Sequence, residues 1–380
     1  MKDLKIRIDY LHVILFFIFI LLILLRSPCS FYLGRPESGL SVFYDYALTN
    51  SLFNSLFYVY SEAKYFELWT NLSAILVSIV PFQSFLVTVY LAFIIKLILL
   101  FYIFFSNSSL LSTTFHKFLF ASFAFYSTAI TPEIWLTTLH SKNFFGILTF
   151  IMLFQNFDKF NKTKFIFYRI GLVLNGLSSI YSSIFSVVYF FKYINERGRT
   201  NFYNFVYSFV PLILNFTIFL YFSLKNFVEN DRFVFELDKI FNLIYSVSLR
   251  PIFGGNLSNF LYKNINFLEY KLIFLFSCIF LILIYFYYFI KKNDNLLNII
   301  IISFILNISF ILLGSQYSDF VGGRYAVISS IIFLTFFIRL IQIEKKPILN
   351  KFFLIIISIS LLIGLVEFRY FNPWMTLLKC

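Results

Sequence analysis

The feature that most limits the fold of this chain is a series of long apolar stretches that contain almost no charge. Ser84–Phe105, for example, holds a single charged residue, Lys96. A helix of about 20 such residues crosses the hydrocarbon core of a bilayer, which is about 30 Å thick. The chain of 380 residues is 60% hydrophobic and 13% charged, whereas roughly 25% of the residues of a soluble domain are charged. We therefore predict an all-α polytopic membrane protein.

We predict about eleven transmembrane helices, because about as many apolar stretches are separated by polar or basic loops. In chain order they are Leu11–Leu25, Ser84–Phe105, Phe118–Ile130, Phe144–Phe157, Ile170–Leu177, Ile180–Phe191, Phe202–Leu224, Leu272–Ile290, Leu296–Leu313, Tyr325–Leu340 and Phe352–Val366. The two stretches beside Ser178-Ser179 are short, so we interpret them as a broken or re-entrant pair that meets near the outer face. The sequence has no internal repeat and no soluble stretch, so residues 1–380 are predicted to form one transmembrane domain.

The basic charge of the chain is unevenly distributed. The net charge is +13, and most of the excess falls in short loops on one side of the predicted membrane, such as the loop with Lys2, Lys5 and Arg7. Cytoplasmic loops carry such an excess, so the N-terminus is predicted in the cytoplasm and the C-terminus outside. This placement accounts for the charge without nucleic acid as a partner and implies membrane lipid instead. The sequence leaves the oligomeric state open.

The polar residues 26–83 are predicted to form an outer loop with interfacial helices. Arg26–Pro81 is too charged to cross a bilayer, yet seven of its residues recur at helical spacing. These are Tyr44, Ala47, Leu48, Ser51, Leu52, Ser55 and Leu56. The aromatic residues typical of a membrane surface follow them, namely Tyr58, Tyr60, Tyr65, Phe66 and Trp69. We predict one or two amphipathic helices on the bilayer surface, and a second long outer loop at residues 225–271.

Several signatures of soluble enzymes are missing from the sequence. It has no Gly-rich phosphate loop, no HExxH motif and no Cys/His metal cluster, and its three cysteines show no metal or redox spacing. These absences argue against a nucleotide-driven enzyme with a cytoplasmic domain. No metal ligand set is predicted, although a divalent cation, Mg or Mn, stays open as a cofactor. Because the substantial polar loops lie on the outer side, we expect any chemistry there.

Three carboxylates in the predicted outer loops are candidates for this chemistry. Glu37 follows the first apolar stretch, where a carboxylate can act as a general base on a sugar hydroxyl or hold a metal ion beside a phosphate. A solvated loop charge or a charge at a helix N-terminus is the alternative for Glu37. Asp45 lies close to the same helical face and is a candidate for substrate binding. Glu133, in a tight loop between two apolar stretches, is either a second catalytic carboxylate or a helix cap.

Basic and aromatic residues near the same predicted surface are candidates for substrate binding. His140 and Lys142 lie in the tight second outer loop, and a snorkelling lysine is the alternative for Lys142. Arg324, followed by Tyr325, can set its guanidinium fork on a phosphate or pyrophosphate, or it anchors its helix at the interface. Arg250 is a further candidate of the same kind.

Five stretches of the sequence resemble a poorly characterised bacterial group within the GT-C class of membrane glycosyltransferases. They are Arg35–Leu40, Tyr65–Pro81, Pro132–Trp135, the Gly176–Ser179 turn and Gly323–Tyr325. The resemblance runs loosely over nearly the whole chain and implies an integral protein of the bacterial inner membrane. The chain departs from the class in two respects. Glu37 is not followed by a second acid, and no large outer domain follows the last apolar stretch.

The resemblance implies transfer of a sugar from a polyprenyl-phosphate donor to a lipid, glycan or protein acceptor at the outer face. Glu37 would be the base or the metal-side carboxylate, Glu133 with His140 would position the acceptor, and Arg324 would bind the donor phosphate. Two other classes stay open: a transporter or flippase of lipid-linked oligosaccharide, and an O-antigen-type polymerase. Surface helices beside a cavity open to lipid would favour the glycosyltransferase, whereas two pseudo-symmetric halves would favour the transporter.

Overall fold

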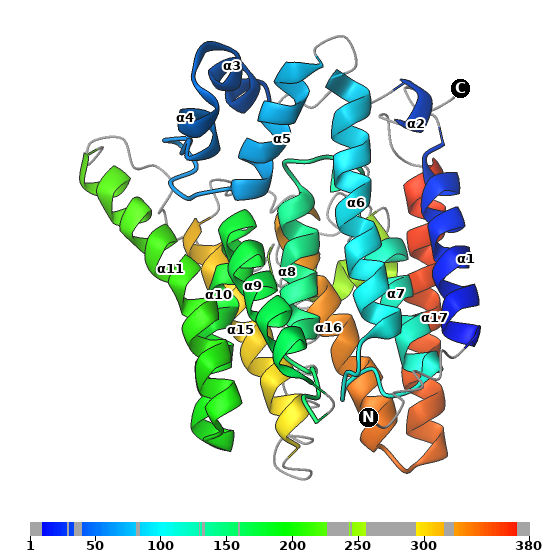
Figure 1. The fold of residues 1–380 in the computed structure, drawn as a ribbon. Helices are drawn as coiled ribbons and strands as arrows, with labels where there is room; N and C mark the ends of the chain where they lie inside the picture. The colour runs from blue at the N-terminus through cyan, green and yellow to red at the C-terminus, as the bar shows by residue number, and fades with distance from the viewer. Residues whose placement is uncertain are drawn as a thin grey trace, which may run out of the picture.

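The computed structural model describes residues 10–28, 30–33, 40–80, 84–128, 130, 134–158, 160–225, 243, 245–255, 294–314 and 323–370. Within these ranges the regular structure is helical, with one isolated β-bridge between Ser108 and Gln155. The prediction of an all-α fold is therefore confirmed for the described residues. Most of the helices run side by side as a bundle, and a group of short helices lies at one end of it (Figure 1).

Five helices in the described part of the chain are long and apolar enough to cross a membrane. They are α6 (Ser84–Phe105), α11 (Arg199–Lys225), α15 (Asn295–Gly314), α16 (Gly323–Ile343) and α17 (Pro347–Tyr370). These helices indicate an integral membrane protein. The larger number of about eleven spans stays a prediction, and the predicted span Leu272–Ile290, with most of the loop 225–271, lies outside the described residues.

The other helices of the bundle are shorter. They are α1 (Tyr10–Arg26), α7 (Thr114–Tyr126), α8 (Ser141–Met152), α9 (Lys162–Ser178) and α10 (Ile180–Glu196). α7 begins before the predicted Phe118, because Oγ1 of Thr113 accepts a hydrogen bond from the backbone N of His116 at 3.2 Å and caps the helix. α8 ends before the predicted Phe157, because the backbone N of Ser109 pairs with the carbonyl of Phe154 at 2.8 Å and draws the chain into a turn.

A break between α9 and α10 is located at Ser179, as the sequence predicts. The Ser179 backbone is extended, with φ −154° and ψ 122°, and its Oγ accepts a hydrogen bond from the backbone N of Ser182 at 3.4 Å. Both helices are longer than the predicted Ile170–Leu177 and Ile180–Phe191, because the polar residues at their far ends are helical too. Ser179 therefore ends one helix and begins the next within a single residue.

The helices α16 and α8 lie in the core of the bundle. In α16, 78% of the most apolar window is buried, whereas in α11 the share is 17%. Every residue of α8 except Lys142 is buried. α11 instead leaves Val210, Ile213 and Phe216 exposed, so it lies at the edge of the bundle. Its apolar outer face is suited to contact with lipid.

The group of short helices at one end of the bundle is called the end layer below (Figure 1). It comprises α2 (Ser30–Leu33), α3 (Ser41–Thr49), α4 (Leu52–Leu56) and α5 (Leu68–Ile79). Leu40 and Phe43 pack against Ala74 and Val77, which fixes α3 on α5.

The end layer lies in the predicted first outer loop but differs from it in detail. The sequence predicts one helical face through Leu48 and Leu52, whereas both side chains are exposed, to 54% and 66%. The reason is Ser51, whose Oγ accepts a hydrogen bond from the backbone N of Asn54 at 3.3 Å and starts a new helix there. Of the one or two helices predicted for this segment, the structure has two short ones, α3 and α4.

Candidate functional site

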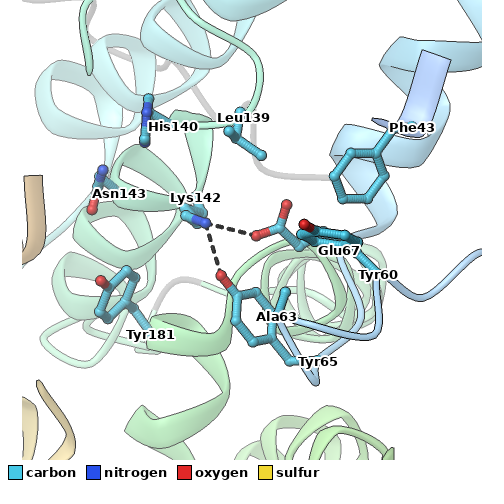
Figure 2. A pocket seen from close by; sticks show the side chains of 10 residues that line it. All are labelled: Phe43, Tyr60, Ala63, Tyr65, Glu67, Leu139, His140, Lys142, Asn143 and Tyr181. Atoms are coloured by element: carbon cyan, nitrogen blue, oxygen red, sulfur yellow. Dashed lines mark hydrogen bonds and ion pairs between the residues drawn. The ribbon is translucent and has the colours of Figure 1, made fainter. Parts of the chain in front are cut away.

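A pocket lies where the loop before α5 meets the start of α8 (Figure 2). Its volume is about 210 Å³. The side chains that line it come from α3, from the loop between α4 and α5, from the start of α8 and from α10. They are Phe43, Tyr60, Ala63, Tyr65, Glu67, Leu139, His140, Lys142, Asn143 and Tyr181. Segments that are far apart in the sequence therefore meet at this pocket.

An ion pair between Glu67 and Lys142 forms the polar centre of the pocket. Nζ of Lys142 lies 2.8 Å from Oε1 of Glu67, and the two side chains are only 16% and 2% exposed respectively. The second carboxylate oxygen of Glu67 accepts a hydrogen bond from Oγ1 of Thr70 at 2.8 Å. A charge buried this deeply needs such partners, because an unpaired carboxylate loses its hydration without compensation.

The helix ends explain why the two charges face each other. Glu67 is the N-cap residue of α5, where the partial positive charge of the helix stabilises a carboxylate. Lys142 lies in the first turn of α8, where the same effect disfavours a cation. Glu67 therefore offsets an unfavourable position of Lys142, and the pair joins the N-termini of two helices.

Tyr65 completes a triad with the ion pair (Figure 2). Its Oη accepts a hydrogen bond from Nζ of Lys142 at 2.8 Å, and the ammonium lies 5.3 Å from the centre of its ring. The residue before it, Lys64, has the left-handed backbone angle φ +59°, and Leu136, in the loop before α8, has φ +51°. Such angles are strained in non-glycine residues. Both loops that approach the pocket thus contain a strained residue.

Two hydrogen bonds, one buried and one partly buried, hold the backbone on either side of the triad. The backbone N of Phe66 donates to Oδ1 of Asn215 in α11 at 2.8 Å. Oγ of Ser179, at the break between α9 and α10, donates to the carbonyl of Lys142 at 2.7 Å. Asn215 also donates from Nδ2 to Oγ of Ser183 at 3.0 Å. The positions of Glu67 and Lys142 therefore depend on α9, α10 and α11.

The protonation of the triad follows from its surroundings. Burial acts to lower the pKa of Lys142, but the Glu67 carboxylate and the Tyr65 hydroxyl outweigh it, so this pKa lies well above its usual value. Burial raises the pKa of the Tyr65 phenol to about 12. At neutral pH the site therefore contains an ammonium ion and a neutral phenol.

The structure brings two of the predicted site residues into the pocket and leaves a third outside it. His140 and Lys142 both line the pocket, from the start of α8. Asp45 lies on α3 with its side chain exposed and outside the lining, although Phe43 on the same helix belongs to it. The role of Asp45 in substrate binding stays a prediction.

Four of the predicted site residues have side chains outside the described part of the chain. Glu37 and Glu133 lie outside the described residues altogether. Arg324 and Tyr325 belong to the first turn of α16, but their side chains are not described. Their assigned roles stay predictions.

Arg250 lies away from the pocket. It follows η5 (Tyr245–Leu249), and its carbonyl accepts a hydrogen bond from Oγ1 of Thr128 at 2.9 Å. The backbone N of nearby Gly255 donates to Oε2 of Glu367 in α17 at 2.8 Å. The Arg250 segment therefore links the ends of α7 and α17, and it is not among the residues that line the pocket.

Trp135, ahead of α8, lies beside two cations, a half-buried arginine and a buried lysine. Its indole ring is 4.7 Å from Cζ of Arg26 and 5.1 Å from Nζ of Lys96. Nζ of Lys96 also lies 4.0 Å from the ring centre of Phe144. Trp135 and Lys96 are both fully buried. Lys96, the single charged residue of the apolar stretch Ser84–Phe105, is thus packed on aromatic faces, which stabilise a desolvated ammonium.

Two residues of the triad were not singled out individually by the sequence analysis. Tyr65 was assigned only to an aromatic surface, and Glu67 was one of several loop charges. The signal that could have identified Glu67 is its position as the sole acid in the stretch Tyr65–Pro81, which carries part of the resemblance. Its partner Lys142 lies 75 residues further along the chain, and no local pattern connects them.

Comparison with models of known protein families, with curated proteins and with solved structures finds no match for this chain. Among the described residues, no three His, Cys, Asp or Glu side chains gather closely enough to hold a metal ion. The chemistry of the pocket is therefore the observation that bears on function. A carboxylate, an ammonium, a phenol, an imidazole and an amide surround a small space beside aromatic rings, which is a set of groups suited to binding hydroxyls.

Proposed function

We propose that this protein is a membrane glycosyltransferase that moves a sugar from a polyprenyl-phosphate carrier to an acceptor at the pocket. The observation that carries the proposal is the position of the pocket. It lies between the end layer and a bundle with five helices that can span a membrane. A lipid carrier dissolved in the bilayer reaches such a site without leaving the membrane. The phosphate ester is already activated, so no nucleotide is required.

The triad supports a binding role for Glu67 within this function. The carboxylate of Glu67 is held in a fixed position by the ammonium of Lys142 at 2.8 Å and by the hydroxyl of Thr70, and a carboxylate has about four acceptor sites. Glu67 is therefore suited to accepting a hydrogen bond from a substrate hydroxyl and holding it in place. His140, on the same pocket wall, would help to orient the acceptor.

The chemical roles outside the pocket keep their assignments from the sequence. Glu37 is the proposed general base or metal-side carboxylate, and Glu133 is the proposed second active-site carboxylate, which positions the acceptor with His140. Arg324 is proposed to bind the donor phosphate, since a guanidinium forms paired hydrogen bonds with phosphate oxygens. A divalent cation, Mg or Mn, is the optional cofactor of this scheme.

The test is incubation of the purified protein in lipid nanodiscs with radiolabelled polyprenyl-phosphate sugars, followed by measurement of the released polyprenyl phosphate. Wild-type protein should release it, and Glu37→Gln should lower turnover by at least about a hundredfold, as expected for loss of a general base. Glu62→Gln is the control, because Glu62 is an exposed acid in the same outer loop. Equal turnover by wild type and Glu37→Gln would remove Glu37 from the mechanism. Movement of the lipid across the bilayer without sugar transfer would favour the flippase.

A further inference from the structure

The charges around the pocket cancel. Among the described lining residues, the carboxylate of Glu67 and the ammonium of Lys142 are the two permanent charges, and they face each other at 2.8 Å. An anionic ligand would therefore meet an ammonium that is already neutralised, together with a fixed carboxylate. Repulsion from a buried carboxylate is strong, because little water screens it. The electrostatics of the pocket favour an uncharged ligand.

The pocket keeps hydrogen-bonding capacity in both directions. The two oxygens of Glu67 accept bonds from Lys142 and Thr70, whereas a carboxylate has about four acceptor sites. The ammonium of Lys142 donates to Glu67 and Tyr65 and has three N–H groups. Oδ1 of Asn143, a residue only 1% exposed, has no hydrogen-bond partner within the described ranges. A ligand with hydroxyl groups, which both donate and accept, matches this set, and phosphate, which mainly accepts, does not.

The apolar part of the lining also fits a sugar. Phe43 and Tyr60 pack edge to face, with ring centres 6.0 Å apart, and Tyr65 and Tyr181 stand on the other sides of the pocket (Figure 2). Sugar rings have C–H faces that pack on aromatic faces, while their hydroxyls point sideways to polar groups. The volume of about 210 Å³ is below the roughly 300–1,000 Å³ of pockets that hold drug-sized ligands. It suits one ring and not an oligosaccharide.

We propose that this pocket binds a single uncharged sugar ring through Glu67, Lys142 and Asn143, and that the phosphate of the lipid carrier binds elsewhere. The proposal rests on the glycosyltransferase function and adds to it the class of group that the pocket accepts. It assigns to Glu67 a selective role, since the carboxylate rejects phosphates and acidic sugars while it holds a neutral one.

The test is saturation-transfer NMR on the protein in nanodiscs with two sets of probes. The neutral probes are glucose, galactose, mannose and N-acetylglucosamine, and the anionic probes are glucuronate and inorganic pyrophosphate. At least one neutral sugar should show transfer to its ring protons, and the anions should neither show it nor displace that sugar. Transfer to glucuronate, displacement by pyrophosphate, or no transfer to any of the neutral sugars would overturn the proposal.

Variants of the pocket sharpen this test. Glu67→Gln keeps the size of the side chain and leaves Lys142 as an uncompensated cation, so glucuronate should now bind while the neutral sugar weakens at least about tenfold. Asn143→Ala and Tyr60→Ala should weaken the neutral sugar without admitting glucuronate. Glu62→Gln, at an exposed position, should change neither. Unchanged sugar binding in the three pocket variants would place the sugar at another site.

The outcomes separate this proposal from the proposed function. One outcome is that the wild-type protein binds a neutral sugar that the pocket variants do not bind, yet transfers no sugar from any lipid carrier. This result would refute the glycosyltransferase function and support the sugar pocket. Sugar transfer at the wild-type rate by both Tyr60→Ala and Asn143→Ala would support the glycosyltransferase function and refute the sugar pocket.

Discussion

The ion pair of Glu67 and Lys142 allows a quantitative test of the packing between α5 and α8. Lys142→Met keeps the length of the side chain but leaves a carboxylate that is 2% exposed without a cationic partner, with the hydroxyls of Thr70 and Tyr65 as side-chain donors. Loss of one partner from a buried pair costs about 3–5 kcal/mol. Glu67→Leu should cost less, about 2 kcal/mol, because the lysine is 16% exposed and its flexible stem lets the ammonium reach water. The double variant buries no unpaired charge and should cost about 1 kcal/mol.

These values predict a coupling energy of about 4–6 kcal/mol between the two residues. The measurement is the free energy of unfolding in mixed micelles titrated with SDS. Trp69 is a suitable fluorescent reporter, because its ring packs against Phe145 of α8 with ring centres 5.9 Å apart. If the cost of the double variant equals the sum of the two single costs within about 0.5 kcal/mol, the pair contributes nothing as a pair. The inference that Glu67 neutralises Lys142 in the pocket would then be refuted too.

Three further predictions concern the support of the pocket and of the bundle. Asn215→Leu removes the hydrogen-bond acceptor of the Phe66 N–H, so it should destabilise the protein by about 1–3 kcal/mol. It should also raise the KM for the sugar acceptor more than it lowers kcat. A larger effect on kcat than on KM would contradict a positioning role. Gly364→Ala should lower the Tm clearly, because a Cβ there would collide with the backbone at the end of α7, whereas Gly171→Ala meets only an ordinary 3.6 Å contact and should have little effect. Burial raises the pKa of Tyr65 from 10.0 to about 12, so the folded state holds the phenol proton more tightly than the unfolded state does, and stability present below pH 10 is lost as the pH rises through 12. Tyr65→Phe should reduce this loss when the free energy of unfolding is measured from pH 9 to about 12. An unchanged slope would show that Tyr65 is not buried as described.

The parts of the fold that the sequence predicted are those that local patterns determine. The helix Ser84–Phe105 has the predicted bounds, because an uninterrupted apolar run leaves little choice to the backbone. The break at Ser179 was visible because serine competes for backbone hydrogen bonds and favours helix caps. Lys142 and His140 were identified because charged residues beside an apolar stretch are unusual.

The parts that the sequence did not predict depend on tertiary contacts. Glu67 acquires its importance from Lys142, and Phe66 from Asn215, which lies 149 residues away. The sequence predicted one or two helices through Leu48 and Leu52, but it did not predict that a cap at Ser51 would separate them. Helical spacing predicts that a segment is helical, but it does not predict the residue at which a side-chain cap interrupts the helix.

The distance along the chain between Glu67 and Lys142 also sets an order of events during synthesis. The ribosome adds about 5–20 residues per second, so the 75 residues between the partners correspond to roughly 4–15 s. Asn215, which holds the Phe66 backbone, is made later still. During that interval α5 carries a carboxylate without its ammonium, and an unpaired carboxylate stays in water. The N-terminus of α5 therefore becomes buried in the protein only after α8 has been made. A nascent chain arrested before Lys142 would keep Glu67 accessible to water-soluble carboxylate reagents.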